Sequence, residues 1–282
     1  MTDMSGRICL VTGATRGIGR ATAEALAKSG AHVLLHGRDS ASVGAVCREM
    51  VRYGQVDGVV GDLSSLAAVR KLATEVAAQY PRLDVLVNNA GTGTRRRQTT
   101  GDGYERTFAI NHLAPFLLTN LLLERLKAGK AARVVTVSSM AHRGAKLDFD
   151  DLNWETRKFS GLGAYGASKL ANILFTVELA SRLAGSGVTA NCLHPGVVAT
   201  NIFTAFGGRT GKVFTMLLRP FMLSPADGAK TSIYLASSPE VANVTGKFFD
   251  KCREVPPTPA AQDAAAAKRL WDVSAKLTGL AG

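Results

Sequence analysis

The sequence predicts an α/β protein with a doubly wound, mostly parallel sheet of seven strands and helices on both faces. Short runs rich in valine, isoleucine and leucine alternate with longer helical patterns along the chain. The runs are continuously apolar, as are strands buried on both faces of a parallel sheet. This alternation, without an internal repeat or a flexible linker, favours one domain over residues 1–282, with a cofactor half at about 1–130 and a catalytic half at about 131–282.

The elements follow one another in a regular order. The predicted strands are residues 7–12, 31–36, 56–61, 83–88, 132–138, 188–193 and 247–249, and the helices between them are residues 17–29, 40–53, 64–79, 103–126 and 165–183. Residues 141–163 and 201–223 interrupt the alternation, and insertions of this length often form binding loops. The tail ends in KRLWDVSAKL, which predicts a helix that packs back through Leu270, Trp271 and Leu277.

The first strand is followed by TGATRGIG, which opens the first helix. Gly13 permits a tight turn, Gly17 lets the backbone approach a pyrophosphate, and Gly19 permits close packing of helix and strand. The phosphates would rest on amide groups at the helix N-terminus. The turn therefore predicts a Rossmann-type dinucleotide site that includes Thr15, Arg16 and Ile18, although glycines placed for packing alone are the alternative.

The end of the second strand indicates which nucleotide binds. NAD-dependent enzymes usually carry an acidic residue there, which binds the ribose hydroxyls. Here the position is Gly37, followed by Arg38, and Arg16 lies in the glycine turn. Two guanidinium groups without a carboxylate favour the 2′-phosphate of NADP(H). Asp39 is interpreted as the N-cap of the next helix.

With these motifs, the chain resembles the short-chain dehydrogenase/reductase family in its single-domain branch. The other motifs of that pattern are GDL at 61–63, NNAG at 88–91, Asn111 within FAINHLAPFLLT, YGASK at 165–169 and HPG at 194–196. VSSMAH, SKLANILFTVELASRL and RLWDVSAKLTGL resemble the retinol dehydrogenase-like subgroup, which also reduces other bulky carbonyl compounds. Those enzymes often carry an N-terminal hydrophobic segment that this sequence lacks, so the resemblance leaves retinoid specificity open.

The resemblance implies further cofactor contacts at the ends of three strands. These residues are Asp62, Leu63, Asn88, Asn89, Ala90, Gly91, Pro195, Gly196, Val198 and Thr200. The first two would flank the adenine ring, and NNAG would line the cofactor unless it serves only as a strand-end turn. Pro195 and Gly196 would turn the chain beneath the nicotinamide. Thr200 would bind the carboxamide, with a helix cap as the alternative.

YGASK offers the acid–base chemistry of carbonyl reduction. Hydride transfer leaves negative charge on the carbonyl oxygen, so a proton donor must lie beside it. The ordinary tyrosine pKa near 10 suits this task poorly unless a cation stabilises the phenolate. In a helix, Lys169 lies one turn beyond Tyr165 on the same face, where it would lower the tyrosine pKa and also hold the nicotinamide ribose.

Two more catalytic residues follow from the resemblance. The family's serine is normally the second of the pair at the end of the fifth strand, which the resemblance identifies as Ser139. Adjacent side chains of a strand point to opposite faces, which supports a choice between the two serines and leaves Ser138 as a neighbour. Asn111 would hold a water that connects Lys169 to solvent, and a buried asparagine that kinks a helix is the alternative. Ser139 and Tyr165 are 26 positions apart, about twice the usual interval but typical of the subgroup. We therefore expect the intervening loop to bulge beside the pocket and affect specificity.

Composition argues against other classes. The net charge is +12, but the basic residues are scattered along the sequence, so no nucleic-acid partner is predicted. The one tight cluster, residues 95–97, predicts a solvated loop. The four cysteines form no CxxC pair, and His112, His142 and His194 lack ligand spacing, so no metal is predicted. No segment is long and apolar enough to span a membrane. These features predict a cytoplasmic protein, with peripheral membrane contact left open.

The sequence therefore predicts a reversible NADPH-dependent reductase of hydrophobic or polycyclic carbonyl compounds. The apolar segment 201–223 fits a substrate lid, a membrane-surface helix or a subunit interface. Apolar faces on the predicted helices 103–126 and 165–183 favour a homodimer or homotetramer. A non-catalytic NADP(H)-sensing protein is the alternative, whereas an epimerase or dehydratase of the family's extended branch would carry TGxxGxxG.

Overall fold

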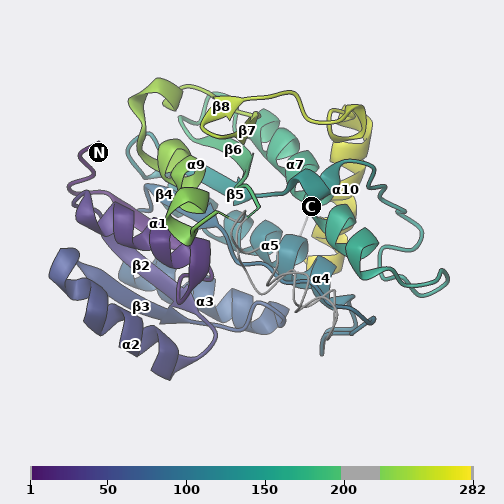
Figure 1. Ribbon diagram of the computed structural model, residues 1–282, viewed down its shortest axis with the longest axis horizontal. Coiled ribbons are helices and arrows are strands. Elements are labelled where there is room, and N and C mark those ends of the chain that lie inside the picture. Colours follow the sequence, from purple (N-terminus) through teal and green to yellow (C-terminus); the bar gives the residue numbers. More distant parts are fainter. Residues whose placement is uncertain (1, 198–222, 281–282) are drawn as a thin grey trace.

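The computed structural model describes residues 2–197 and 223–280, and in these residues eight strands form one sheet (Figure 1). The strands are β1 (Ile8–Val11), β2 (His32–Gly37), β3 (Val56–Val60), β4 (Val85–Asn88), β5 (Arg133–Val137), β6 (Thr189–His194), β7 (Phe248–Asp250) and β8 (Arg253–Glu254). Their order is β3-β2-β1-β4-β5-β6-β7-β8, and every pair is parallel except β7 with β8. The order reverses between β1 and β4, and ligands of such sheets bind at the carboxyl ends beside that point.

Helices cover both faces of the sheet (Figure 1). They are α1 (Gly17–Lys28), α2 (Ser40–Met50), α3 (Leu66–Gln79), α4 (Arg106–Phe108), α5 (Ala114–Leu121), α6 (Leu123–Lys127), α7 (Gly161–Arg182), α9 (Pro225–Ser237) and α10 (Ala264–Thr278). Helices α1, α2 and α9 pack on one face and α3, α5 and α7 on the other. Strand β1 shows the alternation, since Leu10 belongs to the α3 side and Cys9 and Val11 to the α1 side.

The structure differs from the sequence prediction at three elements. A two-residue strand, β8, extends the predicted seven-stranded sheet, and so short a strand has no periodicity to detect. Helix α7 begins at Gly161, one turn before Tyr165, because the Ser160 side chain accepts a hydrogen bond from Gly163 N and offsets the weak helix propensity of glycine. The predicted helix 103–126 is divided into α4, a π-helical turn, α5 and α6.

Helix α10 packs across α5 and α7, beside which it runs in Figure 1. Trp271 contacts the rings of Phe116 and Phe175 with centroids 4.9 and 6.0 Å apart. Leu270 is buried, and Leu277 packs against the same core region, as predicted. Pairing of two chains through these faces of α5 and α7 would therefore require α10 to move, and the predicted oligomer stays a prediction.

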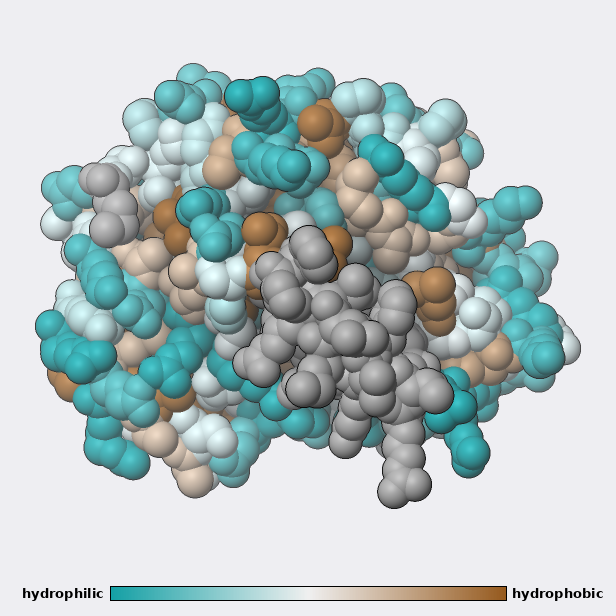
Figure 2. Space-filling model, viewed as in Figure 1, coloured by the Kyte–Doolittle hydropathy of each residue, from teal (hydrophilic) through white to brown (hydrophobic). Residues whose placement is uncertain are grey.

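On the face that Figure 2 shows, the coloured surface is mostly hydrophilic, with hydrophobic side chains in small separate groups. Across the described residues, no helix combines the length and apolarity needed to cross a membrane. Arg95 and Arg96 are exposed, in agreement with a solvated loop, and Arg97 is partly buried through a hydrogen bond from its Nε to Asn153 O.

Candidate active site

The glycine turn is held tightly at two positions and open at the third. Gly13 has φ of +64°, and a Cβ placed on it would lie 2.9 Å from Ala90 Cα. A Cβ on Gly19 would overlap Asn89 Nδ2 and Gly13 O, whereas one on Gly17, at φ of +59°, would meet no atom within 4 Å. The turn thus presses against the segment after β4 while leaving space outside Gly17 at the N-terminus of α1, which fits a bound pyrophosphate.

Hydrogen bonds from the segment after β4 hold the same turn. The Asn89 side chain donates to Thr12 O at 2.8 Å and to Gly13 O at 3.3 Å. The Thr12 hydroxyl accepts from Asn89 N and Ala90 N, a role that its place at the start of TGATRGIG could have indicated. Asn88 points the other way, into the core, where it donates to Thr119 on α5 at 3.0 Å. Its side chain therefore supports α5 and does not line the cofactor turn.

The end of β2 leaves no room for an acidic side chain. A Cβ on Gly37 would lie 2.6 Å from Thr15 Cγ2 and 2.8 Å from Val43 Cγ2. Arg16 and Arg38 are both exposed, and neither forms an ion pair with a described residue. Asp39 accepts a hydrogen bond from Ser42 N at 2.8 Å, which confirms it as the N-cap of α2. Two exposed guanidinium groups thus lie at the glycine turn and directly after β2.

The two residues of the GDL motif that are predicted to contact the adenine ring, Asp62 and Leu63, lie in different surroundings. Asp62 is exposed beyond β3, and its carboxylate accepts from Ser64 N. Partial burial alone would raise the pKa of Asp62, but hydrogen bonds from Ser64 and the charges of Arg38 and Arg106 lower it below the ordinary value. Leu63 is buried in the core on the α3 side, and its contact with the adenine ring stays a prediction.

Tyr165 and Lys169 lie on one face of α7, with Lys169 Nζ 5.6 Å from the Tyr165 ring centroid. Burial raises the pKa of Tyr165 to about 12, and a hydrogen bond with the Ser139 side chain acts in the lowering direction. Burial also lowers the pKa of Lys169 to about 8, while its Nζ donates to Val137 O at 2.8 Å. Tyr165 therefore keeps its proton at neutral pH in this state.

The two serines after β5 are used differently. The Ser138 hydroxyl is buried and donates to Lys169 O at 2.7 Å, so it ties β5 to α7. Ser139 lies on the other side, where its side chain contacts the Tyr165 hydroxyl. Two histidines hold the backbone here: the His142 ring bonds Ser139 O at 2.7 Å, and His194 Nδ1 accepts from N of the next residue, Met140, at 3.3 Å. The VSSMAH and HPG motifs contain both histidines.

Asn111 occupies the π-helical turn, residues Ala109–Leu113, between α4 and α5. Its side chain accepts from Thr92 N at 2.7 Å and donates to Thr92 O and Ser168 Oγ, each at 2.9 Å. A Cβ on Gly91 would lie 3.5 Å from Asn111 Oδ1 and 3.6 Å from Lys169 Nζ, so these groups share one neighbourhood. Wide turns of this kind are frequent at functional sites.

The loop between Ser139 and α7 is built on internal contacts. The Asp151 carboxylate accepts from the backbone N–H groups of the three residues that follow Trp154. The Arg157 guanidinium stacks 3.8 Å from the Trp154 ring centroid. Asn153 Oδ1 accepts from Glu105 N, which fastens the loop to the start of α4. Its part in substrate specificity stays a prediction.

The described residues after β6 end at Val197 and resume at Leu223. Pro195 and Gly196 follow His194, and Gly196 has φ of +83°. Leu223 N donates to Val197 O at 2.9 Å, so the residues on either side of positions 198–222 lie together. Val198, Thr200 and the predicted lid up to position 222 lie outside the described residues.

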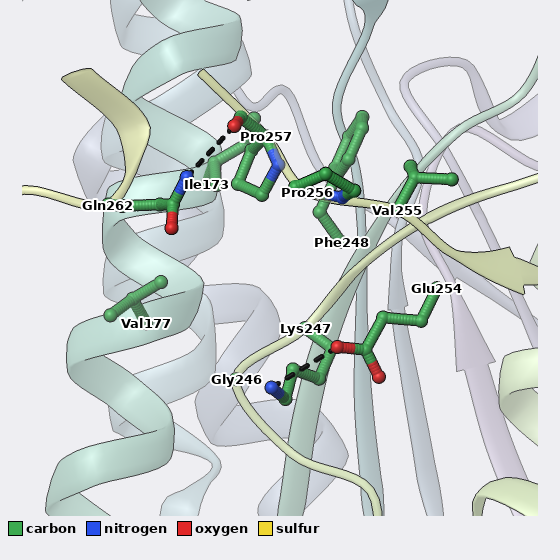
Figure 3. A pocket seen from close by; sticks show the side chains of 10 residues that line it. All are labelled: Ile173, Val177, Gly246, Lys247, Phe248, Glu254, Val255, Pro256, Pro257 and Gln262. Atoms are coloured by element: carbon green, nitrogen blue, oxygen red, sulfur yellow. Dashed lines mark hydrogen bonds and ion pairs between the residues drawn. The ribbon is translucent and has the colours of Figure 1, made fainter. Parts of the chain in front are cut away.

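A surface hollow of about 350 Å³ lies away from these groups, between α7 and the chain around β7 and β8 (Figure 3). Ile173, Val177, Phe248 and the two prolines 256 and 257 form much of its wall. Its two charged side chains, Lys247 and Glu254, pair with each other at 3.2 Å. The hollow presents no free reactive group, and none of the predicted site residues lines it. Across residues 2–197 and 223–280, no cluster of three or more metal-ligating side chains occurs.

Replacing Lys169 by methionine is expected to lower turnover by about two orders of magnitude while stabilising the fold. The amine is buried, and Val137 O would keep the hydrogen bond from Asn172 Nδ2 at 3.3 Å. Because the folded pKa lies below 10.5, the unfolding free energy of the unsubstituted protein should rise between about pH 8 and 10.5. Urea unfolding at pH 7 and 9.5 would measure this, and a less stable variant at pH 7 would contradict it.

The chain is similar to a known protein family and to proteins of known structure. Residues 7–208 match the family described as short chain dehydrogenase. Retinol dehydrogenase 13 of Homo sapiens is 44% identical over 287 residues, which cover 98% of this chain and 85% of that protein. A structure of an uncharacterized protein from Mycobacterium paratuberculosis has a TM-score of 0.82 and 37% identity, covering 99% and 96% of the two chains. The Pseudomonas aeruginosa RhlG/NADP active-site complex has a TM-score of 0.69 and 29% identity, covering 88% and 95%.

Proposed function

Because this chain belongs to the short-chain dehydrogenase/reductase family, and within it to the retinol dehydrogenase-like subgroup, we propose that it is an NADP(H)-dependent reductase of hydrophobic carbonyl compounds. The observation that carries the proposal is the contact between Ser139 and Tyr165 one helical turn from Lys169. A proton donor, a hydroxyl partner and a cation thus lie together near the glycine turn. Oxidoreduction of a CH–OH or C=O group is the chemistry that this arrangement suits.

The chain's own residues supply the proton and the binding of the substrate oxygen. When bound, the dinucleotide supplies the hydride for the carbonyl carbon. Tyr165 Oη gives its proton to the oxygen as negative charge develops there, and Ser139 Oγ holds that oxygen by a hydrogen bond. The Lys169 ammonium stabilises the phenolate that remains. Asn111 positions the segment of Thr92, and the proton returns to Tyr165 through Lys169 and solvent.

The proposed preference for NADP(H) rests on the end of β2 and the glycine turn. Arg38→Ala should raise the KM for NADPH by about 10- to 100-fold, because a charge-assisted hydrogen bond to the 2′-phosphate contributes about 1.5–3 kcal/mol. The KM for NADH should change by less than about twofold, since NADH lacks that phosphate. Initial rates with each nucleotide provide the measurement. Equal losses with NADPH and NADH would contradict the assignment of Arg38.

The proposed substrates are retinal-like, steroid-like or aromatic carbonyl compounds. The chain exposes apolar side chains in the first turn of α7 and shortly after β6, where Leu162 is 65% and Val197 50% exposed. NADPH oxidation, followed at 340 nm with retinal, steroid ketones, aromatic ketones and quinones, tests the proposal. Turnover of at least one class is expected. NADPH binding without turnover of any class would favour the alternative of a nucleotide-sensing protein.

A further inference from the structure

His36 is a buried histidine at the carboxyl end of β2, and the proposed chemistry does not use it. Its side chain is only 1% exposed and points to the α3 side of the sheet, as does Leu34 two residues earlier. Next along the chain is Gly37, beside the predicted site of the adenosine ribose. His36 therefore lies between the glycine turn after β1 and the loop after β3, on which a dinucleotide would rest.

Two hydrogen bonds of the ring join these segments. Gly13 N donates to His36 Nδ1 at 3.2 Å, and His36 Nε2 lies 3.0 Å from Gly61 O. A backbone N–H can only donate and a carbonyl can only accept, so the ring is neutral with its proton on Nε2. The main chain strengthens the link, because Ala14 N donates to His36 O at 2.8 Å.

We propose that neutral His36 is a positioning residue for the dinucleotide, holding the Gly13 turn and the Gly61 loop at the spacing that binding needs. The inference rests on the proposed NADP(H) function. His36 thus occupies the first two amides of the turn, Gly13 N–H through its ring and Ala14 N–H through its carbonyl. Protonated His36 would place an N–H donor against the Gly13 N–H and break the link.

The surroundings favour the neutral ring over the pH range in which the protein would work. Burial lowers the pKa of His36 to about 4, although the hydrogen bond to Gly61 and the charge of Asp62 both act to raise it. Asp62 is the one charged side chain among the described residues that acts on the ring. Since Asp62 lies outside the strand and faces solvent, it does not neutralise a buried imidazolium.

The test is the dissociation constant for NADP⁺, measured by calorimetry for the unsubstituted protein, His36→Leu and His36→Asn. The leucine variant should bind about 10- to 50-fold more weakly, because both bonds are lost. The asparagine variant should recover part of the loss, since its amide can still accept from Gly13 N. In both variants kcat at saturating NADPH should stay within about threefold. His32→Leu is the matched control, because His32 faces the same side of β2 and bonds Asp57 at 2.7 Å away from the turn.

Hydrogen exchange of the Gly13 amide gives a second readout that needs no turnover. Exchange should be slow in the unsubstituted protein and in the asparagine variant and faster in the leucine variant. Unchanged NADP⁺ affinity in His36→Leu, or an equal loss in His32→Leu, would overturn the inference while leaving the proposed function intact. If the unsubstituted protein binds neither NADP⁺ nor NADPH, the proposed function and the inference both fail.

Discussion

Replacing Tyr165 by phenylalanine is expected to lower kcat by about 10²- to 10⁴-fold while the affinity for NADPH changes little. The substitution removes one hydroxyl and keeps the ring, so α7 and its contact with Lys169 persist. Without the hydroxyl, the group assigned to give a proton to the substrate oxygen is missing. Single-turnover rates and NADPH titration would separate the loss of chemistry from a loss of binding.

The pH profile of the unsubstituted enzyme sharpens this expectation. Because burial raises the pKa of Tyr165 to about 12, its proton-donating form dominates throughout the neutral range. Carbonyl reduction should therefore depend weakly on pH near 7, whereas alcohol oxidation should rise with pH as the phenolate form increases. Tyr165→Phe should abolish that rise. Turnover that is unchanged in Tyr165→Phe would refute the assigned acid–base role, and Ser139→Ala with a Ser138→Ala control would then locate the activity.

The fold was predictable because its signals are local. Uninterrupted apolar runs, each followed by a helical pattern, predict parallel strands, and the glycine spacing fixes which strand comes first at the cofactor. The Asp39 cap could be read from its position after Arg38. The start of α7 was missed because its first turn contains Gly161 and Gly163, which weaken the helical pattern that Ser160 rescues.

The contacts that shape the candidate site were less accessible, because they join residues far apart in the chain. Nothing in the sequence pairs His36 with Gly13 and Gly61, since that contact depends on the register of three strands. The direction of Asn88 likewise depends on where β4 ends, and one residue of difference changes the face. Helix α10 covers α5 and α7 through the aromatic contacts of Trp271. The apolar periodicity of α10 predicts that Trp271 is buried but not which residues it contacts.

The other large effect is expected at Gly19, where replacement by alanine should destabilise the protein by about 1–3 kcal/mol and weaken NADPH binding at least tenfold. The added methyl group would overlap both Asn89 Nδ2 and Gly13 O. Asn89 would have to release Thr12 O, to which it donates at 2.8 Å. The clash therefore separates the glycine turn from β4 at the point where the dinucleotide is expected to bind.

Gly44→Ala is the matched control, because Gly44 is also a helical glycine but lies on α2 away from the turn. A Cβ there meets only Arg48 Nη1 at 3.4 Å, the flexible end of a side chain. Alanine at this position should stabilise the helix by about 0.5–1 kcal/mol and leave NADPH binding unchanged. Thermal unfolding and NADPH titration of the two variants test the contrast. If both variants show the same change in stability and in NADPH affinity, helix propensity, and not the packing of the turn against Asn89, determines the effect of alanine at Gly19.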